Sequence, residues 1–133
     1  MKRIIVALVF LLSTTATHAA GPFDGIYSYN FGGTIAGFAS IHEKNGVMIA
    51  ITLDPSPFES GWEAISGIRN GNNVRLSSIF GTVNVEVDIT FNGDNSTGSA
   101  TVISCSDKDD NPSNDSENCD LPAGTVLNLN KIF

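Results

Sequence analysis

The sequence predicts an all-β protein with about eight short antiparallel strands in an up-and-down meander. β-Branched and aromatic residues recur in short runs that Gly, Asn, Asp and Pro separate. No stretch after residue 20 keeps the spacing of an amphipathic helix. Tight connections between successive runs favour a closed barrel over a sandwich, because neighbours in sequence then pair as neighbours in the sheet.

The clearest strand is predicted at residues 82–91. Polar or charged residues there alternate with apolar ones, which are Val83, Val85, Val87, Ile89 and Phe91. Because successive side chains of a strand point to opposite faces, we expect one buried face and one face in water.

Seven further strands follow from the same test, with less regular alternation. They are expected at residues 24–31, 34–43, 47–53, 62–69, 73–80, 99–104 and 125–132. The short connections between them are rich in Gly, Asn and Asp, which tolerate positive φ and suit hairpins. Closure into a barrel would also remove the exposed edge that an apolar run such as 47–53 makes hazardous.

The run Phe23-Asp24-Gly25-Ile26-Tyr27 opens the first expected strand. With the meander that follows, it makes the chain similar in architecture to calycin-type barrels. The resemblance rests on strand and turn patterns, so it implies a calycin-like barrel and no particular activity.

Residues 1–20 have the three parts of an export signal. Lys2 and Arg3 precede an apolar run, and a small, polar stretch ends in Ala19 and Ala20. The apolar run is shorter than the roughly 20 residues that a membrane-spanning helix needs. We therefore expect cleavage after Ala19 or Ala20, no stable membrane insertion, and a single domain over residues 21–133. The mature protein would be located in the periplasm or the medium, and the compact leader favours a bacterial source.

The expected mature chain is strongly acidic. The full sequence has 7 Lys and Arg against 14 Asp and Glu, and loss of Lys2 and Arg3 leaves a formal charge of −9. Such a surface repels nucleic acid and favours basic partners. The same charge is also explained by solubility alone.

Cys105 and Cys119 are the only cysteines. An even number in a small exported chain predicts a disulfide, here closing an acidic loop over residues 105–119. In the chain-entropy model a loop of this length is worth about 3 kcal/mol. The spacing is not the short C-x-x-C of a redox pair.

The acidic loop offers candidate calcium ligands. Asp107, Asp109 and Asn111 alternate and Asp115 follows, as in loops that aim several oxygens at one cation. Pro112, however, stands where the helix-loop-helix calcium motif needs Gly. A solvated acidic loop explains the same residues without a metal. Calcium is thus an alternative here, and no cofactor is required.

Four scarce side chains with polar tips are candidates for the mouth of a ligand cavity, namely Tyr27, Tyr29, His42 and Trp62. An eight-stranded barrel is either filled by its own side chains or just wide enough for one small molecule. Small residues in the expected strands 34–43 and 62–69 leave room for the second case. Ordinary core or surface roles explain the same four residues.

Catalysis is not expected, because His42 is the single histidine after the leader and offers only one candidate base of that kind. The leading hypothesis is an exported, non-catalytic β-barrel protein that binds a small, partly apolar ligand. One alternative is an acidic protein that docks or inhibits a basic partner. A second is a calcium-stabilised extracellular module.

Overall fold

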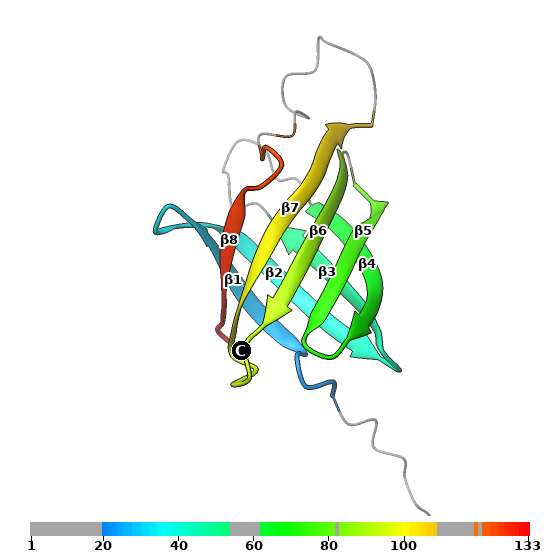
Figure 1. The fold of residues 1–133 in the computed structure, drawn as a ribbon, viewed down its shortest axis with the longest axis vertical. Coiled ribbons are helices and arrows are strands. Elements are labelled where there is room, and N and C mark those ends of the chain that lie inside the picture. Colours follow the sequence, from blue (N-terminus) through cyan, green and yellow to red (C-terminus); the bar gives the residue numbers. More distant parts are fainter. Residues whose placement is uncertain (1–19, 54–61, 82, 109–118, 120) are drawn as a thin grey trace, which may run out of the picture.

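A computed structural model of the chain describes residues 20–53, 62–81, 83–108, 119 and 121–133. Eight strands form one closed antiparallel barrel in chain order (Figure 1). They are β1 (Gly25–Phe31), β2 (Thr34–Lys44), β3 (Val47–Leu53), β4 (Trp62–Asn70), β5 (Asn73–Phe80), β6 (Val83–Phe91), β7 (Thr97–Asp107) and β8 (Val126–Lys131). The predicted all-β meander is confirmed. The predicted closed barrel, rather than a sandwich, is also confirmed, because β1 pairs with β8 and closes the sheet.

The bounds of most strands lie within one or two residues of those expected. β7 is the exception, because it runs from Thr97 to Asp107 instead of 99–104. Its ladder with β6 continues upward to the pair of Val83 with Asp107 and downward to the pair of Phe91 with Gly98. Backbone pairing therefore extends the strand through small and polar residues that carry little strand signal. Among the described residues, no helix has the length and apolar character needed to cross a bilayer.

The pleat of each strand places alternate side chains inside the barrel. In β3, Met48 and Ala50 are buried, whereas Val47, Ile49, Ile51 and Leu53 are between 39% and 48% exposed. In β6 the predicted inward residues Val87, Ile89 and Phe91 are buried. The interior is thus a single apolar core that the sheet surrounds.

The two ends of the barrel differ, and we name them as they lie in Figure 1. The lower end receives the segment before β1, the turns that follow β2, β4 and β6, and the C-terminus. The upper end receives the turns that follow β1 and β5, and the chain that leaves β7.

Aromatic side chains fill the lower end. The rings of Phe23 and Phe91 stack with their centroids 4.2 Å apart, and the ring of Tyr27 lies 6.0 Å from that of Phe91. All three residues are at most 2% exposed. The Tyr27 hydroxyl donates a hydrogen bond of 2.9 Å to the Phe23 carbonyl, which satisfies its polar end inside the core.

Candidate functional site

A cavity of about 240 Å³ lies in the middle and upper part of the barrel interior. Its wall comes from seven of the eight strands and is mostly aliphatic. Ala39, Ala50 and Ala100 are buried residues of this wall. Because alanine ends at Cβ, these three positions leave space that larger core residues would occupy.

The volume is large enough for a small molecule. An apolar cavity of about 150 Å³ in another protein stays dry and binds benzene. By the same packing, a cavity of 240 Å³ accommodates roughly ten non-hydrogen atoms. The barrel is therefore the second of the two cases expected for eight strands, with room for one small molecule.

Three polar side chains line the same cavity, and two of them come from the neighbouring strands β3 and β4. Tyr29 lies near the upper end of β1, Thr52 near that of β3, and Glu63 at the start of β4. The Thr52 hydroxyl donates a hydrogen bond of 3.5 Å to the backbone carbonyl of Glu63. The wall thus has a polar sector toward its upper end, beside an aliphatic remainder.

Two glycines make room for these polar side chains. A Cβ at Gly37 would overlap the Tyr29 hydroxyl, and a Cβ at Gly81 would overlap the Glu63 carboxylate. Gly81 also has a φ of 126°, a conformation that residues with a Cβ rarely adopt. Both contacts depend on the absence of a side chain at the glycine.

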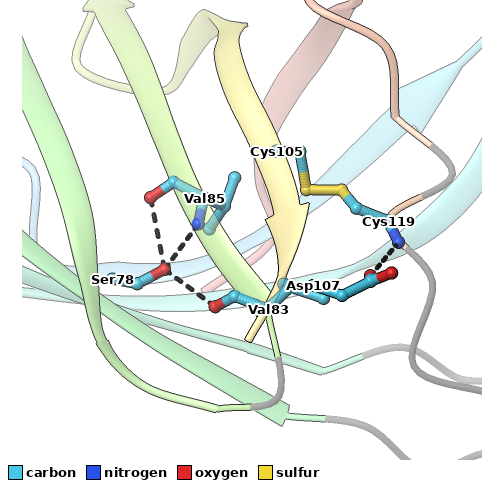
Figure 2. The surroundings of a disulfide bond; sticks show 6 residues. All are labelled: Ser78, Val83, Val85, Cys105, Asp107 and Cys119. Atoms are coloured by element: carbon cyan, nitrogen blue, oxygen red, sulfur yellow. Dashed lines mark hydrogen bonds between the residues drawn. A yellow bond between two sulfur atoms is a disulfide. The ribbon is translucent and has the colours of Figure 1, made fainter. Parts of the chain in front are cut away.

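A disulfide forms part of the cavity wall. Cys105 on β7 is bonded to Cys119, with Cα atoms 5.8 Å apart, which confirms the predicted pair. The Cys119 amide donates a hydrogen bond to Asp107 Oδ1 (Figure 2), and the two atoms are 3.0 Å apart. Both cysteines and Leu121 line the cavity. The crosslink therefore holds Cys119 and Leu121 against the upper part of the cavity.

The Ser78 hydroxyl holds the strand next to the disulfide, because Val85 of β6 pairs with Cys105 of β7. The regular pairing of β5 with β6 stops at Ser77 and Glu86. Above that point the Val85 amide donates to Ser78 Oγ at 2.7 Å, and Ser78 Oγ lies 3.2 Å from the carbonyls of Val83 and Val85 (Figure 2). A side chain thus takes the place of a missing ladder contact.

The structure separates the residues predicted to share a cavity mouth. Tyr29 lines the cavity. Tyr27 has the same inward orientation but lies lower, in the aromatic cluster. His42 is exposed and its Nε2 lies 3.0 Å from Ser40 Oγ, because its neighbour Ile41 points inward. The side chain of Trp62 lies outside the described residues.

Thr52 and Glu63 were not predicted as residues of the cavity wall. A usable signal was present, because Thr52 shares its side of β3 with Met48 and Ala50. Glu63 shares its side of β4 with Ile65 in the same way. Alternation along a strand places polar residues of the same parity inward together with the apolar ones.

Most of the predicted calcium ligands lie outside the described residues, namely Asp109, Asn111 and Asp115. Asp107 is described, and its Oδ1 accepts the hydrogen bond from Cys119. In the part of the chain that the structure describes, no three His, Cys, Asp or Glu side chains form a group able to hold a metal ion. The calcium alternative stays a prediction.

Acidic groups on the outer face of β6 have a basic neighbour. Arg75 on β5 donates two hydrogen bonds of 2.7 Å to the Asp88 carboxylate and lies 3.9 Å from Glu86. The hydrogen bond from Arg75 keeps the pKa of Asp88 below its usual range. Arg75 therefore offsets part of the negative charge on this face of the barrel. Docking of a basic partner, which the net charge favours, stays a prediction.

No known protein family, no curated protein and no solved structure matches this chain.

Proposed function

We propose that the protein is an exported, non-catalytic binding protein that holds one small, partly apolar ligand inside its barrel. The observation that supports this proposal is the cavity of about 240 Å³ within a closed sheet. Concave, mostly apolar sites with a few convergent polar groups are the usual form of small-molecule sites in proteins.

The wall indicates the chemistry of the ligand. An apolar body would lie against Ala39, Ala50 and Ala100, and a polar group would lie near Tyr29 and Thr52. Burial of eight methylene groups at about 0.8 kcal/mol each contributes about 6 kcal/mol. Ordering and desolvation oppose this gain. A simple aliphatic ligand should therefore bind with a Kd between about 0.1 and 1 mM.

The disulfide between Cys105 and Cys119 supports an oxidising location. Together with the leader expected over residues 1–20, it favours the periplasm or the medium of a bacterium. Binding in that setting would make the protein a carrier or scavenger of a partly apolar compound.

The proposal can be tested by titrating the isotope-labelled protein with 1-octanol and following backbone amide shifts. We expect saturable shifts at Ala39, Ala50 and Ala100, because these residues line the cavity. Octylamine and octanoate extend the series to charged head groups on the same chain. Absence of saturable binding for all three compounds would contradict the proposal.

A matched pair of variants locates the site. Ala100→Leu adds bulk inside the cavity, whereas Thr101→Leu adds bulk at the next position of β7, which points to the other face. We expect octanol affinity to fall by about tenfold or more in Ala100→Leu, since roughly half of the apolar contact would be lost. Affinity should be retained in Thr101→Leu. Equal losses in both variants would show that octanol does not bind in this cavity.

A further inference from the structure

The segment just before β1 is fixed at the lower end of the barrel. Asp24 Oδ2 accepts a hydrogen bond of 2.9 Å from the Gly21 amide, and Asp24 Oδ1 accepts one of 2.6 Å from the Glu43 amide. The Asp24 amide in turn donates to the Gly21 carbonyl at 3.1 Å. Gly21 is thereby held in a tight turn against the end of β2.

Glu43 brings a buried carboxylate to the same place. Its side chain is only 6% exposed. Nε and Nη2 of Arg69 each lie 2.8 Å from Glu43 Oε1, which accepts a hydrogen bond from Nε and forms an ion pair with Nη2. Oε2 is inaccessible to water and has no hydrogen-bond partner among the described residues. A buried carboxylate oxygen without a donor is costly, more so than a buried neutral group without one.

The backbone of Gly21 lies against this carboxylate. A Cβ at Gly21 would stand 2.7 Å from Glu43 Cβ and 3.2 Å from Glu43 Oε2. Two carboxylates, those of Asp24 and Glu43, thus lie against Gly21, and within the described part of the chain Arg69 is the one guanidinium bonded to them. One negative charge at this site is left without a positive partner among the described contacts.

We propose that Asp24 and Glu43 form the binding site for the protein's own N-terminal ammonium, created when signal peptidase hydrolyses the Ala20–Gly21 bond. In that step the oxygen of a water molecule adds to the Ala20 carbonyl carbon and the C–N bond breaks. Ala20 leaves as a carboxylate, and the Gly21 nitrogen keeps the electron pair and takes up the two protons of the water.

An ammonium group at Gly21 supplies the hydrogen-bond donors and the positive charge that the site lacks, whereas the amide does not. An amide nitrogen has one hydrogen, which already goes to Asp24 Oδ2. An ammonium has three, so it keeps that bond and has two hydrogens left to donate to Glu43 Oε2, which lies 3.2 Å from the place a Gly21 Cβ would take. Its charge also balances the second carboxylate, and hydrogen bonds between charged partners are the strong ones.

The position of the site selects between the two bonds that the leader leaves open. The leader pattern alone allows cleavage after Ala19 or after Ala20, because both residues are small. The site favours the later bond, because the nitrogen of Gly21 is the one held by Asp24. The two products differ by one alanine.

Mass spectrometry and N-terminal sequencing of the exported protein test the first part. We expect a chain that begins at Gly21. A mature chain that begins at Ala20, or one that keeps the leader, would overturn the proposal.

The second part is tested with chains that begin at Gly21, released from a fusion protein, with the amine either free or acetylated. We expect acetylation to lower the folding equilibrium constant by about tenfold or more, as for loss of a hydrogen bond between charged partners. In Glu43→Gln the effect of acetylation should shrink to about threefold or less, because a neutral amide replaces the carboxylate.

Glu86→Gln is the matched control, since it makes the same change on the outer face of β6 and should leave the full effect of acetylation. Equal stability of the free and acetylated chains would overturn the proposal. An undiminished effect in Glu43→Gln would overturn it as well, and neither result depends on ligand binding.

Discussion

The lower end and the upper part of this barrel are built from the same eight strands, yet one is filled and the other is hollow. Phe23, Tyr27 and Phe91 pack together at the lower end. Higher in the barrel, the inward positions include Ala39 and Ala100, and a cavity remains. The difference shows that side-chain size decides where an eight-stranded barrel is open, whereas alternation only decides which residues face inward.

The two regions are also held in different ways. Stacked rings and an Arg69 guanidinium 5.4 Å from the Phe23 ring centroid secure the lower end. A disulfide and the Ser78 hydroxyl secure the upper end. We therefore expect stability to depend most on the lower end and ligand binding to depend on the upper part.

The largest effect is expected for Phe91→Ala. Removing a fully buried ring from a packed cluster should lower the free energy of unfolding by about 3–5 kcal/mol. Leu127→Ala, in the cavity wall, should cost about 2 kcal/mol, the low end of its range, because its surroundings are already partly empty. Urea unfolding of both variants measures the contrast. A larger loss for Leu127→Ala than for Phe91→Ala would reverse the comparison.

Removal of the disulfide comes next. Changing Cys105 and Cys119 together to Ser should lower the free energy of unfolding by about 3 kcal/mol, because the unfolded chain gains the freedom of an open loop. Octanol binding should weaken as well, since both cysteines line the cavity. Unfolding and amide-shift titrations of the double variant test both effects. Unchanged octanol affinity would show that the disulfide does not shape the octanol-binding part of the cavity.

Alkaline pH should act on the lower end through Tyr27. Burial, with the nearby carboxylates of Asp24 and Asp94, raises the pKa of Tyr27 to about 12. The unfolded tyrosine ionises near pH 10, so the stabilisation is complete below about pH 10 and is lost as the pH rises to 12. The loss amounts to about 3 kcal/mol.

Unfolding curves across this pH range measure the slope. Tyr27→Phe should flatten it, whereas Tyr29→Phe, in the cavity wall, should leave it unchanged. The same alkaline slope in Tyr27→Phe as in the parent protein would show that another group is responsible.

The smallest effect on stability is expected for Ala100→Leu. A larger side chain in a filled core usually costs about 1–3 kcal/mol. At Ala100 the added atoms enter existing space, so the free energy of unfolding should change by less than about 1 kcal/mol in either direction. Urea unfolding decides this, and a loss above 2 kcal/mol would mean that the region is packed already.

The sequence predicted the meander because most strands and turns carry consistent local signals. β6 is the best example, with unbroken alternation and three buried inward residues. β3 could not be oriented in this way, since both of its faces are apolar and only pairing with β2 and β4 fixes which one is inside.

The candidate site was harder to predict, because height along the barrel depends on register. Tyr27 and Tyr29 are two residues apart and both face inward, yet pairing with β2 and β8 places one among the lower aromatics and the other at the cavity. The gathering of Thr52 and Glu63 beside the cavity likewise depends on the pairing of β3 with β4. Such proximity is a property of the closed sheet and has no local signal.

The most direct measurement of the central claim is a crystal structure of the protein under xenon pressure, because xenon occupies apolar cavities without needing a polar contact. We predict xenon bound between Ala39, Ala50 and Ala100. An interior filled by continuous side-chain density, with no xenon there, would contradict the account of this barrel as a binding protein.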